Sequence, residues 1–225
     1  MKRVLILDTE ATGLDPKVDA VIEVACILYS IEHATVIESY SSLIRATDNA
    51  AEAINRIPPA ALVGAEHPDA VWARVMVLTD TADAIVAHNA EFDRGFVRDR
   101  LRDALPWVCS RSDLTWPKQT KPGPSLVSLA LEHDLGVATA HRALADCDLI
   151  ARLFTRAAEL GADLRAMLAR GMRPKAEFIA LVSFDDKDKA KAAGFQWDAQ
   201  RKQWKRRMAV EDAAALPFRT QQVQA

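Results

Sequence analysis

Five ionisable residues in three separate stretches of this chain could do chemistry, and the first two form a pair. Asp8 and Glu10 follow the short apolar run Val4–Leu7, whose composition predicts a buried strand. Because side chains alternate between the faces of a strand, the two carboxylates project to the same side and repel each other unless a cation lies between them. Oxygen ligands favour Mg²⁺ or Mn²⁺. The sequence has no Cys-x-x-Cys or His-x-x-x-His pair that would favour zinc instead.

The second stretch ends in a third carboxylate, Asp93. An apolar strand at 85–87 leads into His88 and Asn89, and the residues from 90 to 101 have the character of a helix. Asp93 would lie in the first turn of that helix, where the helix dipole favours a negative charge. Taken alone, Asp93 is better explained as an ordinary helix-terminal charge, and the first acidic pair as part of a simple turn.

The third stretch runs from His141 to Asp146 and opens a long amphipathic helix. Two residues five apart on a helix point about 140° away from each other. His141 and Asp146 could therefore not face one site if both lay well inside the helix. We expect His141 to lie just before the helix, on a more mobile segment.

Together the three stretches resemble the motifs of the DnaQ-like superfamily of DEDD exonucleases, in the DEDDh subgroup with a histidine five positions before the last aspartate. Ala11 stands where the family often has threonine, but every expected metal ligand is present. The resemblance covers roughly residues 1 to 160 and implies an α/β fold, a ribonuclease H-like mixed β-sheet flanked by helices. The residues that carry it are Asp8-Thr9-Glu10 with Gly13-Leu14, His88-Asn89-Ala90 with Phe92-Asp93, and His141-Arg142-Ala143 with Asp146.

The resemblance implies a metal-dependent 3′-to-5′ exonuclease that hydrolyses terminal phosphodiester bonds of DNA, single strands preferred, to nucleoside 5′-monophosphates. Two divalent ions, Mg²⁺ or Mn²⁺, would lie about 3.5 to 4 Å apart. Asp8 would bridge both, Glu10 and Asp146 would hold the water-activating ion, and Asp93 would act on the second. His141 would accept the proton of the attacking water, since histidine titrates near neutrality. The implied substrate-binding residues are Thr9, Thr12, Gly13, Leu14, His88, Asn89 and Phe92.

Two other functions fit the same residues. One is an exoribonuclease of the same fold, because the motifs do not separate DNA from RNA. The other is an accessory protein that binds nucleic acid after losing catalysis, which the presence of all five residues disfavours. The expected partners are nucleic acid, as single-stranded DNA or 3′ ends, and, for a proofreading subunit, a DNA polymerase or another replication or repair protein. A stand-alone enzyme is equally compatible.

The rest of this region predicts the elements that position the motifs. Two β-like runs, 21–29 and 36–44, would form an antiparallel meander with the first strand. Helical apolar spacing occurs at 69–79 and 125–134, and 107–109 is a short strand candidate. A further helical stretch covers residues 160–170.

Charge divides the chain into two regions. Residues 173–207 carry ten Lys/Arg and five Asp/Glu, whereas residues 1–172 carry 18 basic and 24 acidic side chains. We therefore expect an exonuclease domain at 1–172 and a small basic C-terminal module at 173–225. Within the module we predict a strand at 178–184, a helix at 186–193 and a hairpin at 195–204. This α+β segment resembles a small bacterial domain of unknown function.

The module's aromatic residues have two possible roles. They could stack on the bases of single-stranded nucleic acid, with the neighbouring basic residues on its backbone. They are also what so small a fold needs for a core, and we favour the core for the tryptophans. The aromatic residues are Phe178, Phe184, Phe195, Trp197 and Trp204.

Composition predicts an intracellular protein. Half of the 225 residues are hydrophobic, yet no run is long enough to cross a bilayer, so no membrane association is expected. The chain enters its first strand almost at once, which predicts no signal peptide. Three scattered cysteines, Cys26, Cys109 and Cys147, are typical of core thiols in a reducing cytoplasm.

Overall fold

A five-stranded mixed sheet forms the larger part of the molecule. The computed structural model describes residues 1–101, 105–139 and 141–223. The strand order is β3-β2-β1-β4-β5. The strand β2 lies antiparallel to both β1 and β3, which confirms the predicted meander. The last two strands run parallel to β1, so the predicted mixed sheet is confirmed. The strands are β1 (Arg3–Ala11), β2 (Val21–Ser30), β3 (Thr35–Leu43), β4 (Ala84–Ala87) and β5 (Trp107–Cys109).

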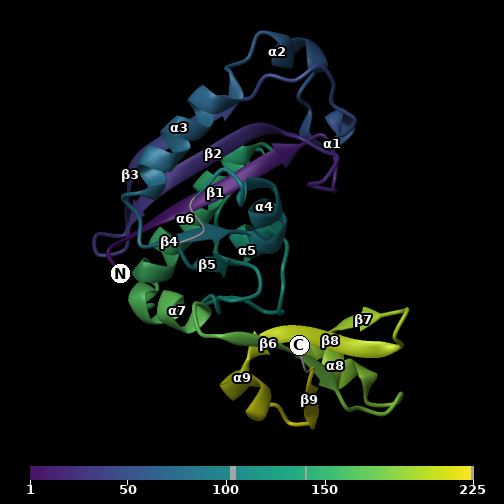
Figure 1. Cartoon of the computed structure of the whole chain (residues 1–225). Helices are drawn as coiled ribbons and strands as arrows, with labels where there is room; N and C mark the ends of the chain where they lie inside the picture. Colours follow the sequence, from purple (N-terminus) through teal and green to yellow (C-terminus); the bar gives the residue numbers. More distant parts are fainter. Residues whose placement is uncertain (102–104, 140, 224–225) are drawn as a thin grey trace.

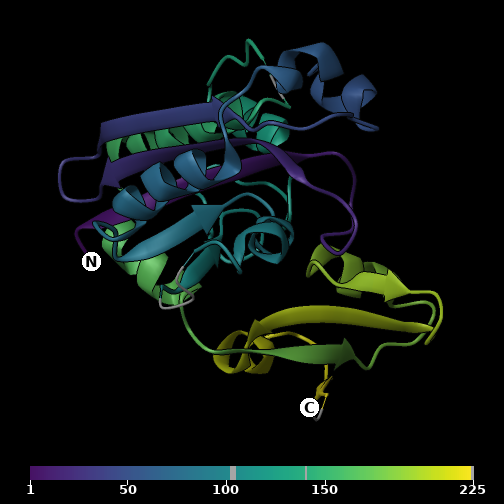
Figure 2. The same ribbon diagram turned by 45° about the horizontal axis from the view of Figure 1, so that its top comes forward.

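Helices cover both faces of this sheet (Figures 1 and 2). One face packs against α3 (Pro68–Thr79), and the other packs against α5 (Leu126–Glu132), α6 (Ala143–Glu159) and α7 (Leu164–Gly171). The helix α4 (Ala90–Val97) follows β4. Two short helices in the β3–α3 connection were not predicted, because so few residues show no helical period. They are α1 (Glu52–Asn55) and α2 (Pro59–Val63).

The alternation of side chains along β1 decides where its carboxylates point. Val4 and Ile6 pack into the core with α6, while Leu5 and Leu7 pack into the core with α3. Since every second residue shares a face, Asp8 and Glu10 continue the face that α6 covers. Both lie within β1, which extends to residue 11.

The other predicted boundaries shift by a few residues. The helix predicted over 90–101 ends at Val97, and α7 begins at Leu164 because the side chain of Asp163 caps it, accepting a hydrogen bond from the Ala166 N–H at 3.0 Å. His141 lies just before α6, as predicted. None of the helices among the described residues combines the length and the apolar character that crossing a bilayer requires.

The chain leaves α7 for a second, four-stranded antiparallel sheet with the order β7-β8-β6-β9 (Figure 2). The predicted helix and hairpin are confirmed, but the predicted strand at 178–184 starts earlier and ends at residue 180. The last helix and strand were not predicted. The elements are β6 (Lys175–Ala180), α8 (Lys187–Ala192), β7 (Gln196–Asp198), β8 (Gln203–Ala209), α9 (Val210–Ala214) and β9 (Thr220–Gln222).

The module's aromatic residues do not share one role. Phe178 and Phe195 are buried in the module's core, and Trp204 packs at its edge. Phe184 is 80% exposed and Trp197 is 51% exposed, so the core role favoured for both tryptophans is wrong for Trp197.

Candidate active site

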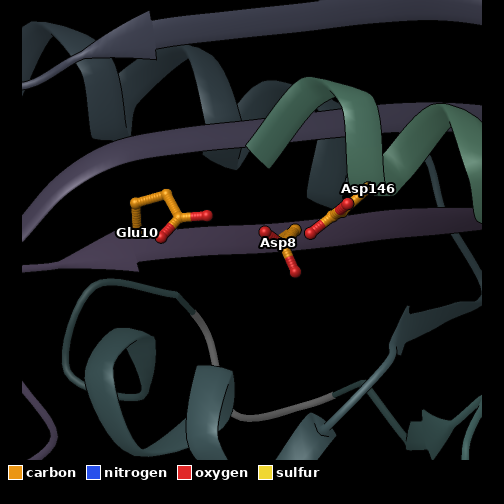
Figure 3. Close-up of side chains that lie close together, drawn as sticks. All are labelled: Asp8, Glu10 and Asp146. Carbon is orange, nitrogen blue, oxygen red and sulfur yellow. The ribbon is translucent and has the colours of Figure 1, made fainter. Parts of the chain in front are cut away.

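Three carboxylates from two elements converge at the carboxyl end of β1. Asp8 and Glu10 come from β1 and Asp146 from the first turn of α6 (Figure 3). Each offers an oxygen within 4.8 Å of the others, and all three are half-buried. A set of closely spaced carboxylate oxygens suits a hard divalent cation such as Mg²⁺ or Mn²⁺.

The electrostatics of the cluster support the same conclusion. Burial, followed by repulsion from Asp93 and Asp146, raises the pKa of Asp8 well above its usual value. Burial and repulsion from Asp146 raise the pKa of Glu10 to about 7. The negative charges thus disfavour one another, and a bound cation would remove that penalty. The residues present therefore fit a divalent metal.

The fourth carboxylate, Asp93, lies beside this cluster in the first turn of α4 and is only 2% exposed. The backbone N–H and the hydroxyl of Thr9 donate to its Oδ1 atom at 3.1 and 2.9 Å. Burial raises the pKa of Asp93 to about 7 although these bonds oppose the shift. Thr9 is itself buried, and its hydroxyl orients a carboxylate of the site.

The fifth residue, His141, is exposed and immediately precedes α6. Burial raises the pKa of Asp146, whereas the nearby His141 side chain and a hydrogen bond from the His141 backbone lower it. The histidine and the aspartate are thus neighbours despite their five-residue spacing. The left-handed backbone of His141, with φ of 61°, makes this turn possible at a conformational cost of about 1 to 2 kcal/mol.

Sequence reasoning missed one partly buried ion pair next to the site. Glu23 on β2 is the register partner of Glu10 on β1, and its side chain is 4% exposed. Its carboxylate accepts hydrogen bonds from Arg142 Nε and Nη2 at 3.0 and 2.8 Å and from the Ala143 N–H at 3.1 Å. The N-cap residue Arg142 makes no side-chain capping hydrogen bond to α6, so Glu23 caps this helix from the neighbouring strand.

The Glu23 pair fixes the segment that carries His141 and Asp146, which makes Glu23 a positioning residue. Glu23→Ala should destabilise the protein by about 1–3 kcal/mol, because the Ala143 N–H loses its acceptor. Glu23→Gln keeps that acceptor and should cost less stability. Both variants should lower kcat at saturating Mg²⁺ by about tenfold, the equivalent of one lost charge-assisted hydrogen bond. Denaturant unfolding and steady-state kinetics measure these effects.

Glu38→Gln, which removes an exposed carboxylate on β3, is the matched control and should leave both quantities unchanged. A fall in stability with wild-type kcat in both Glu23 variants would mean that the pair only supports the fold. The Arg142 side chain is 42% exposed, so solvent screens part of the ion pair and salt should weaken the effect.

Two of the three predicted substrate residues after β1 shape the loop itself. The Thr12 hydroxyl donates to Asp19 Oδ1 at 3.2 Å and accepts from the Ala20 N–H at 3.1 Å. A Cβ at Gly13 would lie 2.5 Å from the same Asp19 carboxylate, so a larger residue there would displace this carboxylate from its contact with Thr12. Leu14 is 82% exposed and is the residue of the three that is available to a ligand.

The predicted substrate residues before and within α4 also include one that supports the structure, His88. His88 joins two neighbouring segments through Ser110 Oγ at 2.9 Å and the Pro124 carbonyl at 3.1 Å. Burial lowers the pKa of His88 to about 4, so its ring is neutral near pH 7 and holds structure rather than charge. Asn89 stands at the start of α4, and the half-buried Phe92 packs on Phe96 with ring centroids 4.9 Å apart.

The raised pKa values predict how the stability of the metal-free protein varies with pH. Glu10 and Asp93 have pKa values of about 7 in the folded protein, against about 4 in an unfolded chain. Between these values the folded state binds more protons, so the free energy of unfolding should fall as the pH rises from about 4 to about 8. Urea titrations in EDTA across this range measure it.

Saturating Mg²⁺ should oppose this loss at the alkaline end, because the cation takes the place of the bound protons. A variant carrying Glu10→Gln and Asp93→Asn should show a flatter pH profile in EDTA. A wild-type stability that rises over the same pH range would contradict the raised pKa values.

Comparison with known proteins agrees with this geometry. A family model described as an exonuclease matches residues 5–154, and one for a domain of unknown function matches residues 176–223. The chain is 29% identical over 164 residues to the PolC-type DNA polymerase III of Thermotoga petrophila, a match that covers 69% of this chain and 12% of the polymerase. It therefore spans only a small part of that relative's length.

Solved structures show the same fold. Exonuclease X in complex with 5′ overhanging duplex DNA is 26% identical with a TM-score of 0.57, and the match covers 75% of this chain and 99% of that one. The nuclease domain of 3′hExo, a DEDDh family member bound to rAMP, is 20% identical with a TM-score of 0.57. That match covers 73% of this chain and 95% of the 3′hExo chain. Because the exonuclease family model matches more than half of this chain, the chain belongs to the exonuclease family. Within that family it belongs to the DnaQ-like 3′-to-5′ group.

Proposed function

We propose that this exonuclease removes nucleoside 5′-monophosphates from the 3′ ends of DNA, preferring single strands. The observation that carries the proposal is the convergence of Asp8, Glu10 and Asp146 with His141 beside them. The exposed side chain of Leu14 projects from the loop that follows this cluster, where it could contact a terminal base. Exonuclease X, the relative of higher identity among the two structures described above, is in complex with DNA.

Two divalent ions, Mg²⁺ or Mn²⁺, are part of this proposal. Asp8, Glu10 and Asp146 would hold one, and Asp8 with Asp93 would hold the other, directly or through water. When bound, such ions lower the pKa of water and stabilise negative charge on a phosphate. The protein's own contribution is to orient Asp93 through Thr9, to hold the start of α6 with Asp146 through the Glu23 pair, and to accept a proton at the imidazole of His141.

A hydrolysis assay of the full chain tests the proposal. The substrates are 5′-labelled single-stranded DNA, the corresponding duplex and the RNA of the same sequence, each with Mg²⁺ or with EDTA. We expect a ladder of strands shortened from the 3′ end in Mg²⁺ and no shortening in EDTA. The rate of shortening should be highest for single-stranded DNA. Faster digestion of the RNA would favour an exoribonuclease, and binding without cleavage would favour an accessory protein.

The setting in which the enzyme works is proposed on less direct grounds. The similarity to a PolC-type polymerase supports a role in replication or repair, with a polymerase as one candidate partner. The three cysteines are free, which agrees with the expected reducing cytoplasm. We keep the division into an exonuclease domain at 1–172 and a module at 173–225, and the two family matches fall on either side of that boundary.

A further inference from the structure

A groove separates α4 and the turn after β5 from the module's sheet. It consists of two adjoining hollows of about 680 and about 490 Å³, both lined by Asn89, Ser112 and Arg207. Lys175 at the start of β6 contacts Asp113 at 2.7 Å across its floor. At its other end a Cβ on Gly194 would lie 3.0 Å from the Pro122 side chain, so the module approaches the exonuclease domain closely there.

The charge of this groove is positive in a chain whose net charge is −2. Eight arginine and lysine side chains line the two hollows, together with four carboxylates. Two lysines pair with three of these carboxylates. Lys175 pairs with Asp113, and Lys205 pairs with Glu177 at 3.0 Å and with Asp198 at 3.3 Å. The positive excess of the lining therefore belongs to the arginines, of which Arg98 pairs with Asp99 and Arg173 pairs with Glu211 and Asp212 outside the two hollows.

Two of these arginines are placed to meet an anion. Arg207 is exposed on β8 and lines both hollows. Arg111 is exposed on the opposite wall, where its Nε donates to the Gly123 carbonyl at 3.1 Å, and no carboxylate pairs with it among the described residues. Guanidinium groups bind phosphate oxygens through several hydrogen bonds. The two walls thus offer phosphate contacts on either side of the groove.

The groove also contains an aromatic surface. Trp197 on β7 lines the smaller hollow and is 51% exposed. Its ring rests on Trp204 at a centroid distance of 5.3 Å, and Trp204 in turn packs on the module's core. An indole held from one side and open on the other is a platform on which a nucleic-acid base can stack.

The groove and the candidate active site share the start of α4. Asn89, which lines both hollows, immediately precedes α4, and Asp93 lies four residues later in the first turn of this helix. A strand whose 3′ end lies at the carboxylate cluster can therefore continue past the start of α4 into the groove.

We propose that this groove binds the single-stranded DNA that lies on the 5′ side of the terminal nucleotide, with Arg111 and Arg207 on its phosphates and a base stacked on Trp197. The inference rests on the proposed exonuclease function and adds the path of the substrate. It assigns the module the task of holding longer strands, while the carboxylates and His141 of the exonuclease domain act on the terminal bond.

Binding measured without catalysis separates this inference from the proposed function. Full-length protein in EDTA is titrated into a labelled poly-dT strand long enough to reach both domains, and fluorescence anisotropy is recorded over a series of salt concentrations. Trp197→Ala should weaken binding by about 5- to 100-fold, the usual worth of one stacked base. Arg207→Ala should also weaken it, and the slope of log affinity against log salt should become less steep by about 0.7.

Matched controls are available on the same module. Phe184→Ala removes an 80% exposed aromatic ring that does not line the groove. Arg201→Ala removes an exposed arginine from the hairpin turn outside it. Both should bind the strand as the wild type does. In Mg²⁺, Trp197→Ala and Arg207→Ala should raise KM for the long strand and leave the hydrolysis of a dinucleotide unchanged.

Equal affinities and equal salt slopes for the groove variants, the control variants and the wild type would overturn the groove as the strand's path, even if the enzyme digests DNA. Wild-type affinity and salt slope for Trp197→Ala alone would reject the proposed stacking contact. The proposed phosphate contacts would then still stand. Conversely, weakened binding by the groove variants in a protein that cleaves no nucleic acid would uphold the groove and reject the exonuclease activity.

Discussion

Asp8→Ala is expected to abolish Mg²⁺-dependent hydrolysis, lowering kcat by about 10³-fold or more, because several kcal/mol of transition-state stabilisation depend on the metal that this carboxylate would share. The same change should raise the free energy of unfolding of the metal-free protein. Burial and four neighbouring carboxylates, Asp93, Asp146, Glu10 and Glu23, raise the pKa of Asp8. Removing its charge therefore relieves repulsion in the folded state, and more so as the pH rises.

Two measurements together identify this behaviour. Hydrolysis of labelled DNA gives kcat, and urea unfolding in EDTA at about pH 8 gives the stability above the pKa of about 7 that Glu10 and Asp93 have in the folded protein. Asp8→Asn should act in the same direction while keeping the side-chain volume. The control Asp48→Asn removes an exposed carboxylate from the segment after β3 and should change neither quantity.

Wild-type turnover in folded Asp8→Ala protein would reject the active site. Lost activity combined with a lower stability would mean that Asp8 supports the fold and would leave its metal role unsupported. The predicted combination, an inactive protein that is more stable without metal, is not expected from a simple folding defect.

His141→Ala should lower kcat by about 10² to 10⁴-fold at saturating Mg²⁺, the usual worth of a general base. Metal affinity should change little, because His141 lies outside the group of three carboxylates that converge. Measuring the rate over a series of Mg²⁺ concentrations separates the two effects. His33→Ala is the control, since His33 is an exposed histidine in the turn between β2 and β3, at the other end of the sheet.

A variant that loses Mg²⁺ affinity but recovers the full rate at high Mg²⁺ would show that His141 is a ligand and not a base. The left-handed backbone of His141 permits a second check. His141→Gly fits this conformation without strain, so imidazole added to the solution should restore part of its rate. No rescue at any imidazole concentration would weaken the base assignment.

Local patterns in the sequence were enough to predict most elements of the exonuclease domain. The apolar run before Asp8, the meander strands and the helix opened by Ala143 follow from side-chain periodicity, which depends only on neighbouring residues. The position of His141 ahead of α6 also followed from helix geometry. The short helices α1 and α2 and the strand β9 did not, because elements of three to five residues form only where tertiary contacts support them.

The sequence by itself was enough to predict the five residues of the candidate site, because these residues and their spacings are local properties of three short segments. Tertiary structure alone decided which side chains support them. Glu23 and Arg142 are 119 positions apart, and Thr9 and Asp93 are 84 apart, so no periodicity links them. The exposure of Trp197 and the groove beside it likewise depend on how two sheets pack, and only the folded chain brings these distant surfaces together.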